Sequence, residues 1–302
     1  MAKILCIGAA HFDIHMKCMK KFITGQSNPV KSLYSMGGVA CNMALHLAHL
    51  DHQVAMKSLT GSDTTIAPQM QDHGVDTSMI DVVPDGISAS YISALDKDGF
   101  VIMGLANMQL YNQMGASFVR RHCARALKYP HWVIDLNLPE EGVEAVKEVM
   151  TDDQKCYVSM ASPAKAKRMF PILSRADALF GCAAEYSEAL NQDIDSIEAA
   201  KATVRDMLDR GPKHVFLTMG KDGVVAGHGD TVKHWPALPV EVKNDAGGGD
   251  AFASGAIDGL INDLPLETVV GQGLVAATYA VSCPYTSQGY MSRAEMINYR
   301  AA

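Results

Sequence analysis

Several features that mark common protein classes are missing from this sequence of 302 residues. Positive charge is not in excess, because 26 Lys and Arg stand against 33 Asp and Glu, a formal net charge of −7. That balance lacks the basic surplus typical of nucleic-acid-binding proteins, so we expect no nucleic-acid partner. No run reaches the roughly 18 apolar residues of a membrane-spanning helix, so we expect no membrane partner either.

The seven cysteines have neither the spacing of a disulfide framework nor that of a zinc ribbon. Their number is odd, they are widely spaced, and no Cys-x-x-Cys occurs. Cysteines of this kind are typical of a reducing compartment, where they act as small buried hydrophobic residues. The apolar run 4–10 is short and is followed by His11 and Asp13, which predicts a buried strand rather than a signal peptide. We therefore expect a cytoplasmic protein.

Two nucleotide-binding motifs are also missing. No G-x-x-x-x-G-K-[ST] occurs, which excludes a P-loop kinase, and no G-x-G-x-x-G follows the first predicted strand, which disfavours a dinucleotide-binding fold. The pairs His11/His15 and His46/His49 have a spacing found among metal ligands, but no cysteine or carboxylate partners stand at matching positions. We interpret these histidines as structural or surface residues.

What the sequence does contain is an ordinary globular composition, 48% hydrophobic and 20% charged, with 25 glycines. This composition excludes a disordered or collagen-like chain. The length suits one large α/β domain or two unequal ones. Because no internal repeat or low-complexity linker divides the chain, we expect a single domain over residues 1–302.

Over the second half of the sequence, stretches typical of strands alternate with stretches typical of helices. Strand 132–136 precedes helix 140–150, and helix 197–210 precedes strand 214–218. This alternation predicts a mostly parallel sheet with helices on both faces, a three-layer α/β/α domain. Further helices are expected at 39–50, 119–128, 164–173 and 250–261.

The stretch 88–105 has a different pattern. Two segments of alternating polarity flank the turn Asp96–Gly99, which is typical of a β-hairpin with one face free to line something. This hairpin lies within residues 86–112. Together with residues 12–35, we expect it to form a small β-sheet lid inserted in the main domain.

The most informative segment is Asn244–Phe252, which reads NDAGGGDAF between a predicted strand at 240–242 and a predicted helix. Its glycines allow close approach to a ligand, and their amides at a helix N-terminus form a site for an anion. Asp250 would repel a phosphate, unless it accepts a proton from an attacking hydroxyl while the amides neutralise a transferring phosphoryl group. The other interpretation is a plain glycine turn with an aspartate helix cap, and the residues alone leave both open.

Two segments resemble the signatures of one family. NDAGGGDAF is similar to D-T-x-G-A-G-D-A-F, and Gly37–Ala44 (GGVACNMA), about 200 residues earlier, is similar to G-G-x-x-x-N-x-A. Both occur in this order in the ribokinase-like (PfkB) carbohydrate and nucleoside kinases, which the chain resembles over about residues 3–292. The resemblance implies a ribokinase-like three-layer α/β/α fold with a lid. It also implies an ATP-dependent kinase that phosphorylates a primary hydroxyl of a sugar or nucleoside.

The resemblance also implies roles for the residues that match. Asp250 would be the catalytic base, and ATP and Mg²⁺ the cofactors, with Glu185 holding the ion through water. An exposed lid implies a homodimer formed through it. The other matching residues are Ala246, Gly247, Gly248 and Gly249 for the phosphate anion hole, Asp13, Gly37, Gly38, Asn42 and Asn137 for the substrate, and Thr218, Gly220 and Gly223 for ATP.

The chain departs from the family pattern near both ligands. Cys182 replaces the Asn of the N-x-x-E stretch that ends at Glu185, which bears on magnesium handling. Asn244 and Asp245 replace the usual Asp-Thr, so activation by a monovalent cation is left open. Gly248 replaces the middle Ala of G-A-G-D, a change that we expect to be tolerated.

Two segments bear on the substrate. Residues 95–110 are similar to the D-x-x-G…D-M-x-I stretch of pseudouridine kinases, with Asn107 in place of its second Asp. Ser35–Asn42 resembles their S-x-G-G-V-x-R-N, with Cys41 in place of Arg. Pseudouridine is therefore the expected substrate. The alternatives are a family member acting on ribose, fructose or a purine nucleoside, and a sugar- or nucleoside-binding regulator that has lost turnover.

Overall fold

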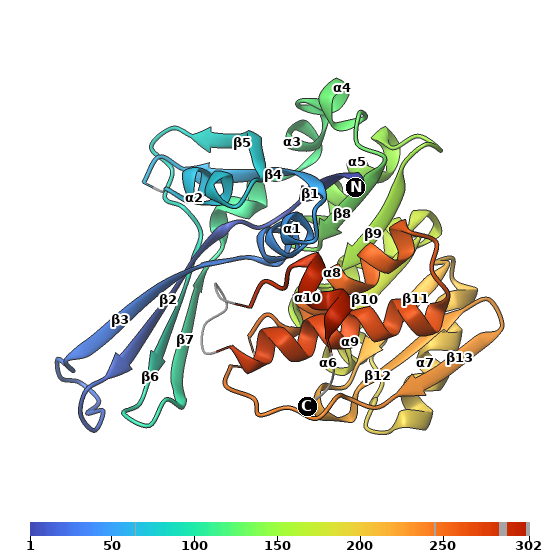
Figure 1. The fold of residues 1–302 in the computed structure, drawn as a ribbon. Coiled ribbons are helices and arrows are strands. Elements are labelled where there is room, and N and C mark those ends of the chain that lie inside the picture. Colours follow the sequence, from blue (N-terminus) through green and yellow to red (C-terminus); the bar gives the residue numbers. More distant parts are fainter. Residues whose placement is uncertain (64, 245, 284–288, 300–302) are drawn as a thin grey trace.

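The computed structural model describes residues 1–63, 65–244, 246–283 and 289–299, so Asp245 lies outside the described residues. Its main body is built on a nine-stranded sheet (Figure 1). The seven strands from β5 to β11 are parallel, and β12 and β13 continue the sheet antiparallel to their neighbours. In order across the sheet, the strands are β13 (Thr231–Trp235), β12 (Val224–His228), β11 (His214–Thr218), β10 (Ala178–Cys182), β9 (Lys155–Ser159), β8 (His131–Asp135), β1 (Lys3–Ile7), β4 (Gln53–Gly61) and β5 (Asp76–Val83).

Helices cover both faces of this sheet, which confirms the expected three-layer α/β/α architecture. None of the helices in the described part of the chain is long and apolar enough to cross a membrane. One layer contains α1 (Val39–His49), α2 (Ile66–Asp72), α8 (Gly248–Ile261) and α9 (Leu266–Ser282), with α10 (Arg293–Asn298) packed on α9. The other contains α3 (Ala116–Arg120), α4 (Cys123–Ala126), α5 (Glu140–Val149), the 3-10 helix η2 (Pro163–Arg175), α6 (Ala183–Leu190) and α7 (Ile197–Asp209).

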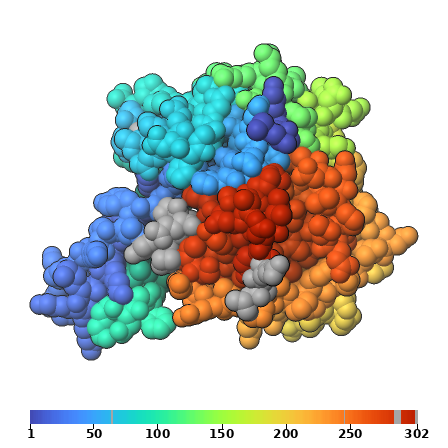
Figure 2. All heavy atoms as spheres, in the orientation of Figure 1, coloured from blue at the N-terminus to red at the C-terminus, as the bar shows by residue number. Residues whose placement is uncertain are grey.

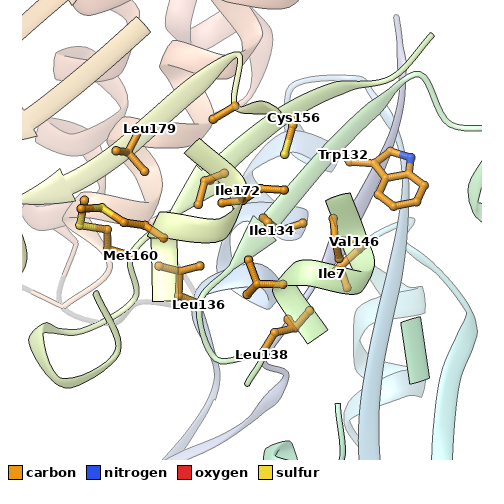
Figure 3. Packing of buried hydrophobic residues seen from close by; sticks show 14 of the residues in the cluster. Ile7, Trp132, Ile134, Leu136, Leu138, Val146, Cys156, Met160, Ile172 and Leu179 are labelled. Atoms are coloured by element: carbon orange, nitrogen blue, oxygen red, sulfur yellow. The ribbon is translucent and has the colours of Figure 1, made fainter. Parts of the chain in front are cut away.

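Strand β1 shows why the two layers form. Ile4 and Cys6 pack in the cluster that contains α1, α8 and α9, whereas Leu5 and Ile7 pack in the cluster on the opposite face. All four side chains are fully buried, because successive residues of a strand point to opposite faces and both faces are covered. Figure 3 shows the second cluster, in which side chains of the sheet pack against helical residues such as Val146.

A second, four-stranded sheet projects from one side of the main body (Figures 1 and 2). Two antiparallel pairs are joined through the parallel pair β2 and β6. The four strands overlap the ranges 12–35 and 86–112 that were predicted for a lid, with β2 beginning at His11 and β3 ending at Gly37. In order across this sheet, the strands are β3 (Val30–Gly37), β2 (His11–Cys18), β6 (Ser90–Leu95) and β7 (Val101–Asn107).

Three predicted elements differ in the structure. The expected helix 119–128 is divided into α3 and α4, because His122 adopts the left-handed conformation with φ 60°. The expected helix 164–173 is a 3-10 helix with Pro171 inside it, where proline removes a backbone donor. The expected strand 240–242 is irregular, and it follows two prolines that have no N–H for a strand ladder. Val240 and Val242 line a cavity instead.

Candidate active site

The candidate site lies where the parallel strands β1, β8, β10 and β11 end and helix α8 begins. Asp135 ends β8, Cys182 ends β10 and Thr218 ends β11. Because parallel strands share one carboxyl edge, their last side chains converge at that edge, the usual ligand site of open α/β sheets. The four-stranded sheet adds residues of β2 and β3 to the same region through the short link from β1 to β2.

Asp250 lies in the first turn of α8 and faces α1. Asn42 Nδ2 donates a hydrogen bond of 2.7 Å to Asp250 Oδ2, which joins two helices that are 208 residues apart in sequence. Helix α8 starts after Gly247, whose φ of 80° lies in the left-handed region that favours glycine. Gly248 and Gly249 contribute first-turn amides, which have no acceptor within their own helix. The predicted acid and two predicted anion-hole residues therefore share one helix end.

Two further residues were predicted for the anion hole: Gly247 is the N-cap residue of α8, and Ala246 lies in the turn before it. The amide of Ala246 donates to Asn244 Oδ1 at 3.1 Å, within the turn that precedes α8. This amide therefore has a protein acceptor, whereas the amides of Gly248 and Gly249 are placed at the positive end of the helix dipole. Helix geometry favours the two glycines over Ala246 for binding an anion.

Burial and neighbouring acids control the ionisation of Asp250. Its pKa is raised from 3.8 to about 7, chiefly because burial penalises the charged form, and the hydrogen bond from Asn42 offsets only part of that effect. The charges of Asp135, Glu185 and Asp13 raise it further. A carboxyl group with a pKa near neutrality can take up and release a proton under ordinary conditions, as a general base must.

Asp135 holds the backbone of three site segments together. It is fully buried, and its Oδ2 accepts from the amides of Ala9 at 3.0 Å and Ala40 at 2.8 Å. Its Oδ1 accepts from the amide of Asn137 at 2.8 Å. The carboxylate thereby ties the end of β1, the start of α1 and the loop after β8 to one point. It was not among the predicted site residues, although it belongs to the same short stretch as Asn137.

Asn137 contacts the protein rather than open space. It is buried, and its Oδ1 accepts from Lys165 Nζ. Arg168 donates to the carbonyls of Leu136, Asn137 and Leu138 at 3.0 to 3.3 Å. These two cations of η2 hold the loop after β8, and burial lowers the pKa of Lys165. Nothing in the sequence pattern around η2 indicated either residue.

Asp13, Gly37 and Gly38, which were predicted to contact the substrate, lie together. The carboxylate of Asp13 is partly exposed, and a Cβ at Gly37 would lie 2.4 Å from its Oδ2. Gly38 has a φ of 97°, and a Cβ there would lie 2.5 Å from the carbonyl oxygen of Ala9. Only glycine fits both positions, so the GG pair brings α1 and the four-stranded sheet close to the end of β1.

A cavity of about 530 Å³ lies beside the start of α8. Thr218, Gly220 and Gly223, the three residues predicted for ATP, all line it. Its remaining wall is largely apolar, as expected of a site for a flat organic ring. That wall includes residues of α9 that sequence reasoning did not single out, namely Leu274, Ala277, Thr278 and Val281.

A smaller cavity of about 200 Å³ lies next to it and reaches Asp250 and Glu185. Thr218, Gly249 and Phe252 line both cavities, so the two are neighbours along a single path. That path leads from an apolar pocket past helix-terminal amides to a carboxylate. An elongated molecule with an aromatic end and an anionic end matches this order of surroundings.

The sequence pattern of the pfkB family carbohydrate kinases matches residues 1–292. The chain belongs to the PfkB family of carbohydrate kinases. This confirms the resemblance found in the two glycine signatures. It also confirms the expected enzyme class, because carbohydrate kinases are phosphotransferases that use an alcohol group as acceptor.

Individual relatives of this PfkB kinase match along almost its whole length. The chain is 24% identical to the pseudouridine kinase of Escherichia coli K12 over 299 residues, 98% of this chain and 95% of that protein. Its fold is similar to that of a carbohydrate kinase from Agrobacterium tumefaciens, with a TM-score of 0.84, 26% identity and coverage of 98% and 96%. It is also similar to Arabidopsis thaliana ribokinase complexed with ribose and ATP, with a TM-score of 0.84, 16% identity and coverage of 98% and 97%.

Glu185 is the residue of this PfkB kinase predicted to hold magnesium. Its Oε2 accepts from the amide of Cys182 at 2.7 Å and so caps α6, and burial raises its pKa. Glu185 and Asp250 line the smaller cavity together, and carboxylate oxygens are the protein ligands that Mg²⁺ prefers. Among the described residues, no group of three or more His, Cys, Asp and Glu is placed to hold a metal alone. The residues therefore fit an ion whose other ligands are water and phosphate oxygens.

Proposed function

We propose that this PfkB kinase transfers the γ-phosphoryl group of ATP to a primary hydroxyl of a sugar or nucleoside, with pseudouridine as the substrate and pseudouridine 5′-phosphate as the product. The observation that carries the proposal is the placement of Asp250. It lies at the end of a path that begins in an apolar pocket and passes the amides of Gly248 and Gly249.

In the proposed reaction, Asp250 accepts the proton of the acceptor hydroxyl. The hydroxyl oxygen forms a bond to the γ-phosphorus while the bond to the bridging oxygen of ADP breaks. The first-turn amides of Gly248 and Gly249 and the helix dipole stabilise the charge on the transferring group. Glu185 would hold Mg²⁺ through water, and the ion would supply neutralisation of phosphate charge. Asn42 positions the Asp250 carboxylate through its 2.7 Å hydrogen bond.

The proposed acceptor site lies between Asp13 and Asp250. Carboxylates in this position accept hydrogen bonds from the hydroxyls of a neutral acceptor, and Asn42 Oδ1 provides a further acceptor atom. Residues 12–35 and 86–112 would act as the lid of a single domain over residues 1–302. Closure of the lid would exclude water and so limit hydrolysis of ATP.

Pseudouridine is favoured by two kinds of similarity. The chain matches the E. coli pseudouridine kinase over almost its whole length, and the lid segment 95–110 is similar to the corresponding stretch of that group. Cys41, which replaces the Arg of the pseudouridine kinase pattern, is fully buried and carries no positive charge, so it cannot replace the interactions of an Arg. The 24% identity to the ribokinase of Bacillus subtilis keeps a free sugar as the alternative.

A panel of acceptors tests the proposal. Consumption of ATP is measured with pseudouridine, uridine, adenosine, ribose and fructose, and kcat/KM is expected to be highest for pseudouridine. A higher value for ribose, fructose or adenosine would assign the enzyme to that acceptor. Acceptor binding without turnover would favour a regulator and contradict the kinase mechanism. Comparing rates with and without KCl settles whether a monovalent cation activates the enzyme.

The pH dependence of the reaction follows from the raised pKa of Asp250. The base acts only when ionised, so kcat/KM for the acceptor is expected to fall about tenfold per pH unit below the pKa of about 7 and to level off above it. The measurement is kcat/KM between pH 5 and 9 at saturating ATP. A profile that stays flat down to pH 5 would contradict a base with a near-neutral pKa.

The lid sheet has an apolar face that the described part of this chain leaves uncovered. Every residue of β7 is exposed, and Met103, Leu105 and Tyr34 have exposed fractions of 47%, 54% and 64%. In the lid sheet, Leu105 pairs with Ile92, whereas Asp13 pairs with Tyr91. Because successive strand residues point to opposite faces, Leu105 lies on the face of the lid sheet opposite Asp13. We propose a second copy of this chain as the cover, because a matching apolar sheet buries this face in a symmetric dimer.

Leu105→Asp is therefore expected to convert a dimer to a monomer, because it places a charge in the middle of the proposed interface. Sedimentation equilibrium measures the change. Ile297→Asp, which alters an even more exposed apolar residue on α10, is the control and is expected to leave the dimer intact. A wild-type monomer, or a dimer that persists in Leu105→Asp, would contradict this interface.

A further inference from the structure

Five buried side-chain N or O atoms in the described part of the chain have no hydrogen-bond partner. Two of them, on Trp235 and Gln272, belong to β13 and α9. The other three are Ser35 Oγ, Asn42 Oδ1 and Tyr290 OH. A buried polar atom without a partner costs free energy, and such atoms are rare in native proteins unless a ligand or water satisfies them. These three atoms come from segments far apart in sequence.

The ring of Tyr290 is fixed by three histidines. It stacks on His49 with ring centres 5.2 Å apart and meets His46 and His73 edge to face at 5.0 and 5.6 Å. Asn42, His46 and His49 recur at helical spacing on α1, so they lie along one side of that helix. Tyr290 therefore packs beside the same side of α1 that carries Asn42.

The hydroxyl of Tyr290 lies within electrostatic range of the acids of the proposed acceptor site. Burial is the main cause of its raised pKa, and the charges of Cys41, Asp250 and Asp13 raise it further. All three of these groups lie at or near the N-terminal end of α1, whereas the histidines that hold the ring lie further along it. The ring of Tyr290 thus packs on the histidines of α1, while its hydroxyl is buried within range of the charge of Asp250.

Ser35 reaches the same region from the lid sheet. It lies directly opposite Asp13 in the antiparallel pair of β2 and β3, and directly opposite residues of such a pair have side chains on the same face. Ser35 is 6% exposed, although the strand up to Tyr34 is exposed. Its hydroxyl is therefore buried next to the Asp13 carboxylate.

We propose that Tyr290 and Ser35 are acceptor-binding residues whose hydroxyls, together with Asn42 Oδ1, bind the hydroxyl groups of a neutral polyol such as a ribosyl ring. This inference rests on the proposed function and deepens it. Tyr and Ser hydroxyls both donate and accept, whereas Asn42 Oδ1 only accepts, so the ligand must present at least one donor. The carboxylates of Asp13 and Asp250 disfavour an anionic acceptor such as a sugar phosphate.

Tyr290→Phe tests the proposal, because it removes the hydroxyl and keeps the ring that the histidines hold. The acceptor KM is expected to rise about 5- to 20-fold, with kcat changed less than about threefold and the KM for ATP unchanged. The melting temperature without acceptor is expected to stay the same or rise, because the lost hydroxyl has no protein partner. Ser35→Ala is expected to raise the acceptor KM by a similar factor.

Tyr279→Phe is the matched control. Its hydroxyl donates to Glu295 Oε1 at 3.2 Å on the surface, so its removal is expected to leave both KM values unchanged. An unchanged acceptor KM in Tyr290→Phe, or a lower melting temperature, would show that the hydroxyl is structural and would overturn this inference alone. A wild-type protein inactive on every acceptor of the panel would instead refute the proposed function, and this inference with it.

Discussion

Asp250→Asn is expected to reduce kcat by about 10³-fold, within the roughly 10²- to 10⁴-fold that general-base catalysis contributes. The substitution keeps the size of the side chain and an oxygen that can accept from Asn42, but it removes the basic carboxylate. Binding is therefore expected to persist, with Kd values for ATP analogue and acceptor within about threefold of wild type. Single-turnover kinetics and equilibrium binding provide the two measurements. Turnover near the wild-type rate at saturating substrates would contradict the assignment of the base.

The same substitution is expected to stabilise the enzyme at high pH. The pKa of Asp250 is about 7 in the folded protein, above its ordinary value of 3.8, so the unfolded chain loses this proton at lower pH than the folded one. The free energy of unfolding therefore falls as pH rises from about 4 to 7. Removing the carboxylate is expected to recover about 1–3 kcal/mol at pH 8 and almost nothing at pH 4, since one pKa unit corresponds to about 1.4 kcal/mol.

Asp258→Asn, on the same helix, is the control for this stability effect. Asp258 is fully buried, but its pKa is lowered, because hydrogen bonds from His52 at 2.8 Å and Arg293 at 2.7 Å outweigh the effect of burial. Its substitution is expected to lower the free energy of unfolding at pH 8, the opposite of Asp250→Asn. Urea denaturation at pH 4 and pH 8 compares the two. A loss of stability in both variants would contradict the raised pKa of Asp250.

Asp135→Asn is expected to lower the free energy of unfolding by about 2–4 kcal/mol, because the new amide group must face a backbone amide that needs an acceptor. In the wild type, both carboxylate oxygens of Asp135 accept hydrogen bonds, Oδ2 from Ala9 and Ala40 and Oδ1 from Asn137. An asparagine has only one side-chain oxygen, so no orientation satisfies all three donors. We also expect the acceptor KM to rise at least about tenfold, because Ala40 begins the helix that carries Asn42.

Asp177→Asn is the control that separates the loss of stability from the loss of acceptor binding expected for Asp135→Asn. Asp177 accepts from the amide of Cys156 at 2.9 Å and from Lys213 at 2.7 Å, at the edge of the sheet where its strands begin. We expect this variant to lose stability while its kinetic constants stay at wild-type values. Urea denaturation and steady-state kinetics are compared for both variants. If Asp135→Asn left the acceptor KM unchanged, its role would be structural only.

Features of the chain that depend on neighbouring residues could be predicted from the sequence. The apolar run of β1 predicted a strand covered on both faces, and Gly247 to Asp250 predicted a glycine turn into a helix, because backbone conformation and helix ends depend on adjacent residues. The same reasoning was wrong for the predicted helix 119–128, which is divided into α3 and α4 because His122 adopts a left-handed conformation. The prediction of a strand at residues 240–242 was also wrong, because these residues are apolar but have no partner strand to pair with.

The contacts that assemble the candidate site depend on strand register and helix packing, which no short stretch of residues specifies. Asn42 meets Asp250 across 208 positions, and Asp135 meets Ala9 across 126. For the same reason, Lys165 and Tyr290 had no local signal: one is a surface-type residue in an irregular helix, and the other becomes informative only when its hydroxyl is found buried without a partner. The sequence thus determined which residues have side chains suited to the proposed phosphoryl transfer, and packing in three dimensions determined which of them meet.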